Sequence, residues 1–329
     1  MNINWKTFLL SQQASFNHED HVTFPVAGDV GDKSIYPLTY LAVLTVSGKD
    51  AAKLLQGQIT CNVNDVNETK SSLAAMCNPK GRAIATFLLV KKADAFLLVL
   101  PVELLETVKK RLQMVVLRSD VKITDATDEY CLLGLCVPDK PVQSFATAIE
   151  QAIISVNFPS LTNRKLLIAD ANNAIRFWTE QVDRQGFCMA GSDDWRYLDI
   201  ISGIPWLTTE TSEEFIPQML NLDKLGGISF NKGCYTGQEI VARTHYLGKV
   251  KREMFLAECQ TSVPPGPNST IVNRDSDGQE EVGKVLLAQQ NGQNCKMLII
   301  LQTTEPAFSN LVLSGNIQAQ LTLLPFSHG

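Results

Sequence analysis

The sequence predicts an α+β protein that ends in a small all-β domain. Two observations predict this class. Through roughly the first 250 residues, clusters of strand-like apolar runs alternate with single helical segments, which favours α+β units over one long parallel sheet. Beyond residue 250, short β-like runs are separated by Pro, Gly, Asn and Ser without helical periodicity. That texture indicates a β-barrel or sandwich of about 80 residues.

Composition excludes several classes of protein. The chain has 329 residues, a length typical of about two domains. Its hydrophobic fraction of 45% and charged fraction of 19% exclude a disordered or fibrous chain. Lys and Arg number 29 and Asp and Glu number 34, so the net charge is −5. An acidic balance argues against direct nucleic-acid binding, which usually shows a basic patch.

The cysteines predict a reducing compartment. There are eight, widely spaced in a long chain and without a CxxC pattern, so zinc-knuckle and ferredoxin motifs are absent. Reduced thiols are the default for such a chain. No apolar run resembles a signal peptide or approaches the ~20 residues that span a bilayer. We therefore expect a cytoplasmic protein without a stably bound metal and without membrane contact.

The first 120 residues are expected to form a small sheet with two helices. Residues 1–37 are polar and irregular. Ser47 begins a capping pattern before a short helix at 51–56, and apolar residues recur at helical spacing over 102–117. Pro79 and Gly81 fit a type I turn between two strands. The expected strands lie at 38–46, 72–77, 82–91 and 95–100.

The remaining elements follow the same alternation. A strand-like stretch at 120–136 precedes a helix-like stretch at 142–153, and a further capped helix begins at Ser192. The expected strands of the middle region lie at 165–169 and 174–178. Those of the C-terminal domain lie at 252–258, 282–288, 296–301 and 317–323.

Trp195 is the first candidate ligand contact. It lies in the helix that begins at Ser192, with Asp193 and Asp194 in the first turn. A tryptophan at this spacing is more often a core residue. The alternative is a flat platform on which a heteroaromatic ligand stacks.

The segment 232–239, KGCYTGQE, carries the most chemistry. Thr236 and Glu239 form a capping-box pattern, which places Cys234 two residues before an expected helix start. The positive end of the helix dipole and the charge of Lys232 would both favour the thiolate. Gly233 leaves the backbone open to approach. A reactive cysteine and a buried structural cysteine are about equally supported by this local pattern.

Other chemistries have weaker support. Cys234 and His245 are too far apart in sequence to be diagnostic of a nucleophile–base pair. No phosphate-binding GxxxxGK[ST] loop occurs. The basic cluster 249–252 is better interpreted as an exposed strand start than as a contact for RNA or another polyanion.

KGCYTGQEIVAR, with HYLGKVKR after it, resembles the signature of the YgfZ-type folate-binding proteins, which are related to the aminomethyltransferase (T-protein) of glycine cleavage. The similarity covers roughly residues 38–325, and shorter stretches outside the signature support it. These matches are Gly57–Thr60, Asn78–Gly81, Gly203–Pro205, Phe215–Gln218, Asn221–Leu222 and Leu225–Phe230. The resemblance implies ferredoxin-like folate-binding subdomains and a C-terminal β-barrel. The expected divisions are 1–120 with 190–248 for the folate-binding region, 121–189 for a second subdomain and 249–329 for the barrel.

The resemblance also implies ligand, partners and site. The ligand is tetrahydrofolate or a derivative, and the partners are iron–sulfur proteins or their assembly machinery, through which some tRNAs are modified. Cys234 is the implied functional thiol, with Lys232 beside it. Trp195 matches a tryptophan that contacts folate, whereas the second such position holds Tyr40-Leu41. The other motif positions are Gly233, Tyr235, Thr236, Gly237, Gln238, Glu239 and Arg243.

The residues of one strand distinguish a folate-dependent enzyme from a folate-binding accessory protein. The related aminomethyltransferases carry an acidic pair there, suited to stabilising charge or moving a proton beside the folate nitrogen. In this chain Ala85-Thr86 stand at those positions. The leading hypothesis is therefore a folate-binding accessory protein for iron–sulfur cluster assembly or repair, without classical turnover. The alternatives are a folate-dependent aminomethyl-type transferase and a folate-binding regulator without redox chemistry.

Overall fold

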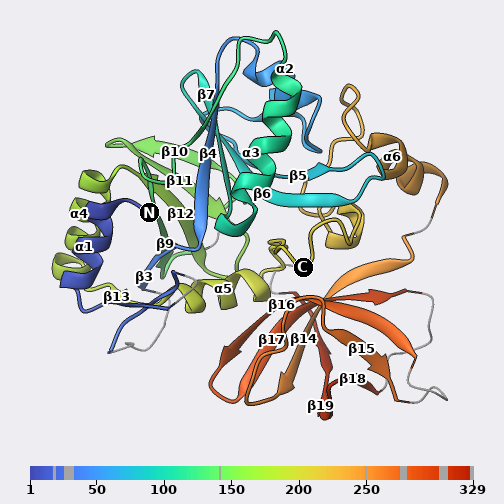
Figure 1. Cartoon of the computed structure of the whole chain (residues 1–329). Helices are drawn as coiled ribbons and strands as arrows, with labels where there is room; N and C mark the ends of the chain where they lie inside the picture. The colour runs from blue at the N-terminus through green and yellow to red at the C-terminus, as the bar shows by residue number, and fades with distance from the viewer. Residues whose placement is uncertain are drawn as a thin grey trace.

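The computed structural model describes all residues except 18–19, 26–32, 141, 249, 275–279, 304–309 and 327–329. Within the described residues, the strands form sheets of five, six and seven strands and one two-stranded ribbon, β1 (Ser15–Phe16) with β2 (Val22–Thr23). Figure 1 shows the seven-stranded sheet below the other two. The predicted α+β class is confirmed. Lys249 of the basic cluster lies outside the described residues.

The five-stranded sheet has the order β5-β6-β7-β4-β8, and every neighbouring pair is antiparallel. Its strands are β4 (Leu41–Ser47), β5 (Ser72–Cys77), β6 (Ala83–Lys92), β7 (Ala95–Pro101) and β8 (Lys122–Asp125). In β6, every residue from Ala83 to Val90 is buried, because both faces of the sheet are covered. The helices α2 (Ala51–Gln56) and α3 (Val102–Val116) pack on this sheet, and α3 buries Leu104, Leu105, Val108 and Leu112.

The six-stranded sheet has the order β10-β11-β12-β9-β3-β13. Its strands are β3 (Ser34–Pro37), β9 (Cys131–Val137), β10 (Thr147–Glu150), β11 (Ile153–Phe158), β12 (Asn163–Ala169) and β13 (Cys188–Met189). Two helices, α1 (Ile3–Ser11) and α4 (Ala171–Thr179), pack together where the rings of Trp5 and Trp178 meet edge to face at 5.7 Å. A π-helical turn, Glu180–Arg184, continues α4.

The seven-stranded antiparallel sheet at the C-terminus is nearly closed and barrel-like, so the predicted β domain is confirmed. Its order is β19-β18-β15-β16-β17-β14-β20. The strands are β14 (Arg252–Gln260), β15 (Thr270–Asn273), β16 (Glu281–Asn291), β17 (Asn294–Gln302), β18 (Leu311–Leu313), β19 (Asn316–Gln320) and β20 (Thr322–Leu324).

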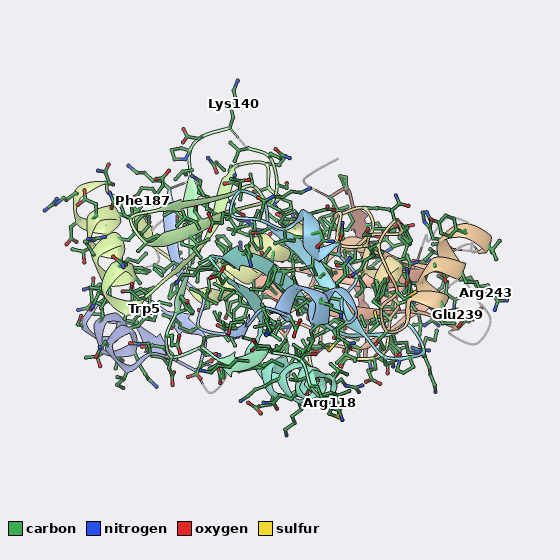
Figure 2. All side chains as sticks on the ribbon, turned by 90° about the horizontal axis from the view of Figure 1, so that it is seen from above. Trp5, Arg118, Lys140, Phe187, Glu239 and Arg243 are labelled. Carbon is green, nitrogen blue, oxygen red and sulfur yellow. The ribbon has the colours of Figure 1, made fainter. Side chains whose placement is uncertain are left out.

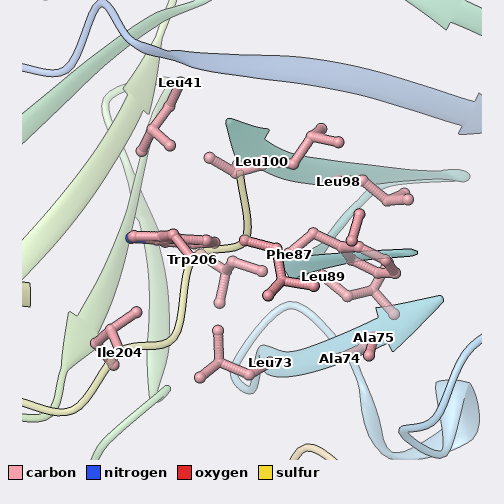
Figure 3. Close-up of a cluster of buried hydrophobic side chains, with 14 of the residues drawn as sticks. Leu41, Leu73, Ala74, Ala75, Phe87, Leu89, Leu98, Leu100, Ile204 and Trp206 are labelled. Carbon is pink, nitrogen blue, oxygen red and sulfur yellow. The ribbon is translucent and has the colours of Figure 1, made fainter. Parts of the chain in front are cut away.

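One hydrophobic core joins the five-stranded sheet to the barrel. It contains side chains of β4 to β7, of the segment after α5 (Ser192–Ile201), and of β14, β16 and β17. In Figure 3, Trp206 and Ile204 lie in the same cluster as Leu73, Phe87 and Leu100. Two short elements lie between α5 and the barrel: the 3₁₀ turn η3 (Pro217–Leu220) and α6 (Gln238–Leu247). A further 3₁₀ turn, η1 (Val63–Asp65), follows α2.

Two expected elements have the wrong type. The helix expected at 142–153 is replaced by β10 and β11, since Ile153, Ile154 and Val156 are β-branched residues buried in the sheet. The strand expected at 174–178 lies inside α4. There Asp170 accepts a hydrogen bond from the Asn173 amide as an N-cap, and Ala171, Ala174 and Trp178 are buried at helical spacing.

The division of the chain among the sheets also differs from the expected boundaries. The N-terminal segment forms α1 and β3, and β3 pairs with β9 of the six-stranded sheet rather than with the first subdomain. Conversely, β8 follows residue 120 but pairs with β4 of the five-stranded sheet. The five-stranded and six-stranded sheets therefore each contain a strand from outside the residue range expected for them. A search of the helices within the described residues finds none with the length and hydropathy of a transmembrane span.

Candidate functional site

A cavity of about 350 Å³ lies where α5, the five-stranded sheet and the barrel meet. It contains several polar side chains against an apolar wall. The lining residues are His21, Tyr40, Pro101, Val102, Glu103, Arg196, Asp199, Ile200, Trp206, Leu207, Thr208, Glu210, Pro267 and Leu287. Its size is in the range of ordinary small-molecule sites.

Asp199 is the buried carboxylate of this cavity, with 1% of its surface exposed. Its Oδ2 accepts a hydrogen bond from Trp206 Nε1 at 2.8 Å and a longer one from the Tyr40 hydroxyl at 3.5 Å. Its Oδ1 lies 2.9 Å from Arg164 Nη2 in an ion pair that is not aligned as a hydrogen bond. Burial raises the pKa of Asp199, and the Arg164 charge opposes that rise.

The buried guanidinium of Arg164 lies over the ring of Trp195. The Arg164 guanidinium carbon lies 4.5 Å from the Trp195 ring centroid and 5.4 Å from that of Phe158. A Cβ on Gly134 would come within 2.2 Å of the Trp195 ring, so only glycine allows this approach. Trp195 is fully buried and does not line the cavity. This placement fits the core interpretation and not a ligand platform.

Of the other expected ligand contacts, Tyr40 lines the cavity and Leu41 does not. Leu41 is buried in the hydrophobic cluster of Figure 3. Trp206 is the aromatic residue that the sequence analysis missed. The matched stretch Gly203–Pro205 directly precedes it, so its position beside that motif was the available signal.

Two basic side chains lie at the edge of the same cavity. His21 Nδ1 is 2.5 Å from Asp193 Oδ1, and Arg196 Nη1 is 3.3 Å from His21 Nε2. The guanidinium of Arg196 lies over the Tyr40 ring at 5.7 Å. Arg196 is thereby oriented toward the aromatic wall.

Thr86, which with Ala85 was expected at the position of the acidic pair, is hydrogen-bonded within the fold. Its hydroxyl donates to the Pro205 carbonyl at 2.6 Å and accepts from the Leu207 amide at 3.1 Å. Thr86 is 1% exposed and its neighbour Ala85 is fully buried. The Thr86 hydroxyl therefore fixes the loop that carries Trp206. Neither Ala85 nor Thr86 supplies an acid to the cavity.

The segment around Cys234 is a separate feature. Cys234 is exposed and does not line the cavity. Lys232 Nζ donates to the carbonyl oxygens of Ile59 and Cys61, both at 2.7 Å, and lies 5.0 Å from the Tyr235 ring centroid. Burial lowers the pKa of Lys232 to about 8. Lys232 thus holds the segment against the chain after α2.

The helix after Cys234 begins one residue later than expected. Gly237, in a left-handed conformation with φ of 83°, is the N-cap of α6, and no side chain caps the helix. Thr236 instead donates its amide to the Gly57 carbonyl at 3.2 Å and its hydroxyl to Gln58 Oε1 at 3.4 Å. Gln238 Oε1 accepts from the Tyr235 amide at 3.2 Å. The predicted Thr236 capping box is therefore wrong.

The remaining motif residues serve different purposes. Gly233 has open space around it, and a Cβ there would meet no atom within 4 Å. Figure 2 shows Glu239 and Arg243 pointing outward at one end of the molecule, and both are exposed. The structure brings Cys234, Lys232 and Tyr235 together but leaves them apart from the Asp199 cavity. No group of three or more metal-ligating side chains occurs in the part of the chain that the structure describes.

Comparison with known proteins agrees with this fold. The model of the GCVT N-terminal domain matches residues 32–175. The crystal structure of the glycine cleavage system aminomethyltransferase T from Bartonella henselae superposes with a TM-score of 0.78 over 99% of this chain and 97% of that chain. The two sequences are 11% identical, so this likeness shows the fold alone. The predicted T-protein-like architecture is confirmed.

Two relatives cover most of the chain. The tRNA-modifying protein YgfZ of Colwellia psychrerythraea is 30% identical over 275 residues, which are 81% of this chain and 84% of the relative. The tRNA-modifying protein YgfZ of Hamiltonella defensa is 32% identical over 257 residues, covering 75% and 76%. With this identity over most of both lengths, the chain belongs to the YgfZ family.

Proposed function

We propose that this protein binds a reduced folate in the Asp199 cavity and acts as an accessory protein rather than as an aminomethyltransferase. The observation that carries the proposal is a buried carboxylate facing the cavity between two aromatic side chains, Tyr40 and Trp206. Family membership and the T-protein fold make a folate the first ligand to test.

The residues fit the pterin ring of a folate. One edge of a pterin presents adjacent N–H donors, and a carboxylate can accept about four hydrogen bonds. Asp199 lines the cavity and accepts hydrogen bonds from two described side chains, Trp206 and Tyr40, so its carboxylate has acceptor positions left for a ligand. Tyr40 and Trp206 supply aromatic surface for the flat ring. Arg196 at the cavity edge supplies a positive charge for the carboxylates of the glutamate tail.

Thr86 supports binding over group transfer. Moving a one-carbon unit onto a folate nitrogen requires an acid–base group or a charge stabiliser beside that nitrogen. At the position where the aminomethyltransferases carry acids, the Thr86 hydroxyl has no carboxylate to offer, and its proton is donated to the Pro205 carbonyl.

Cys234 is the proposed functional thiol. Its neighbours on both sides are anchored, by Lys232 to the Ile59 and Cys61 carbonyls and by Thr236 to Gly57, while Cys234 itself is exposed. Such a loop suits contact with another protein. Because an iron–sulfur cluster normally has four ligands, any cluster contact is transient or shared with a partner. We place this thiol in iron–sulfur cluster assembly or repair and, through iron–sulfur enzymes, in tRNA modification.

Anaerobic titration with tetrahydrofolate tests the ligand. We expect saturable binding that Trp206→Phe, which keeps an aromatic ring but removes the donor to Asp199, and Asp199→Asn both weaken. Cys234→Ser is the matched control and should bind as the wild type does. Absence of binding by the correctly folded wild type would overturn the folate assignment.

Two further measurements separate the alternatives. With methylene-tetrahydrofolate as donor, robust one-carbon transfer that survives Cys234→Ala would establish the transferase and sink the accessory role. In cells that depend on this protein, unchanged iron–sulfur enzyme activity after Cys234→Ser would favour a regulator without thiol chemistry.

A further inference from the structure

A second cavity of about 380 Å³ lies beside the Cys234 segment and shares no lining residue with the Asp199 cavity. Its walls come from η1 and the strand that follows, from the stretch before Lys232, and from the end of α6. The lining residues are Cys61, Asn62, Asp65, Val66, Lys70, Ser72, Gly226, Ile228, Ser229, Phe230, Asn231, His245 and Tyr246. No part of the proposed folate site uses them.

Three rings form an aromatic corner in this cavity. The His245 ring lies flat on Phe230, with centroids 3.7 Å apart and planes 12° apart. Tyr246 stands nearly perpendicular to His245, at 4.7 Å and 78°. Both His245 and Tyr246 are exposed, and Tyr246 has 62% of its surface accessible. The corner therefore offers a flat ring face with a second ring beside it.

Polar groups of both charges line the same cavity. Asp65, Lys70 and Asn231 make no side-chain hydrogen bond or ion pair with any described residue. A carboxylate can accept N–H groups from the edge of a base, an amide can both donate and accept, and an ammonium group binds phosphate. The combination of a ring face with these groups matches the parts of a nucleotide.

We propose that this cavity binds one nucleotide of a single-stranded RNA. The base stacks on the exposed ring of His245 beside Tyr246, as unstacked RNA bases do on aromatic side chains. Asp65 accepts from the base edge, and Lys70 contacts the phosphate. This proposal is independent of the folate site.

Arg243 favours an RNA strand over a free nucleotide. It lies on α6 three residues before Tyr246, so the two side chains are neighbours on one helix face. Its side chain is exposed, does not line the cavity and makes no ion pair or hydrogen bond with a described residue. A guanidinium in that place contacts a phosphate next to the bound nucleotide. The net charge of −5 predicted no general RNA binding, but a site for one nucleotide needs only these local groups.

Fluorescence anisotropy with a labelled single-stranded hexaribonucleotide of mixed sequence, competed by unlabelled GMP, tests the proposal. We expect binding by the wild type that Lys70→Gln and Tyr246→Ala each weaken about tenfold, which corresponds to ~1.4 kcal/mol. Lys110→Gln, an exposed lysine on α3, is the matched control and should leave the affinity unchanged. Arg243→Gln should weaken the hexaribonucleotide but leave GMP competition unaffected, whereas an equal loss for both would place Arg243 at the nucleotide itself and overturn its assignment to a neighbouring phosphate.

Lack of hexaribonucleotide binding by folded wild-type protein would overturn the proposal. So would binding that is unchanged by both Lys70→Gln and Tyr246→Ala, because the RNA would then lie elsewhere. Because the probe is RNA and the variants lie outside the Asp199 cavity, either failure is distinguishable from failure of tetrahydrofolate binding.

Discussion

Gly81 and Gly237 pack against each other without room for a side chain on either. A Cβ on Gly237 would lie 2.9 Å from Gly81 Cα and 2.5 Å from the Asn78 carbonyl oxygen. A Cβ on Gly81 would lie 2.8 Å from Ile240 Cβ. Two motifs more than 150 residues apart in sequence, the turn at 78–81 and the start of α6, are thus one packed unit.

Gly237→Ala should therefore destabilise the protein more than its backbone conformation alone requires. Gly226 is a matched control, since its φ of +73° is close to the +83° of Gly237 but a Cβ there would meet no atom within 4 Å. We expect about 1 kcal/mol of strain at Gly226 and about 3 kcal/mol or more at Gly237, where contact is added. Urea denaturation of both variants measures the difference. Equal losses would show that the close contact with Asn78 and Gly81 has no energetic effect.

Removing Arg164 should be costly because it leaves a buried charge without a partner. Arg164 and Asp199 have 0% and 1% of their side chains exposed. We expect Arg164→Met to lower the free energy of unfolding by about 3–5 kcal/mol. Arg184→Met, which breaks the surface pair with Glu180, should cost about 0.5 kcal/mol or less. Similar effects in the two variants would mean that Asp199 is neutral in the folded protein.

Lys232 predicts a pH-dependent difference in stability. Burial lowers its pKa from 10.5 to about 8, so above pH 8 the folded protein releases a proton that the unfolded chain keeps. Since the unfolded state then binds more protons, the contribution of Lys232 to the free energy of unfolding rises with pH through that window. In urea titrations, the free energy of unfolding of the wild type minus that of Lys232→Met should increase from pH 7.5 to pH 10. A constant difference would place the pKa of Lys232 near its ordinary value.

The cysteines should differ in their rates of alkylation. Cys234 is exposed and Cys188 is partly exposed, whereas the other six are buried. Burial raises the pKa of Cys61 to about 11 and that of Cys77 to about 12, which disfavours their thiolates. Limited iodoacetamide treatment followed by peptide mass spectrometry should find Cys234 modified first. Cys234→Ser should remove the fastest phase, and labelling of a buried cysteine before Cys234 would contradict the exposed loop.

Local sequence patterns predicted the elements whose signals do not depend on distant partners. The 102–117 helix is present as α3 because its apolar residues repeat at helical spacing and face the sheet. The β texture after residue 250 likewise became the barrel. Segment 174–178 was assigned wrongly because AIRFW is apolar enough for a strand; the Asp170 N-cap is a local signal of the helix, and the contact of Trp178 with Trp5 of α1 adds a distant one. That contact joins segments far apart in the chain.

The site was only partly predictable for the same reason. Cys234 and its motif were found because their residues are contiguous in sequence. The Asp199 cavity combines side chains from the N-terminal segment, α5 and the barrel, so no local pattern marks it. Trp195 lies in α5 and Trp206 lies shortly after it, and only packing decides which ring reaches the cavity. Gly134 makes room for Trp195 in the core, and the Thr86 hydroxyl positions the loop of Trp206.

The position of β3 in its sheet determines when this strand can pair during synthesis. Ser34–Pro37 pairs with β9, whose residues begin at Cys131, and with β13, at Cys188–Met189. With chains made from the N-terminus at about 5–20 residues per second, β3 waits several seconds for its first neighbour and longer for its second. During that interval β4 to β8 can form the five-stranded sheet while β3 has no neighbouring strand. The N-terminal segment is therefore the part of the nascent chain for which chaperones and proteases have the longest access.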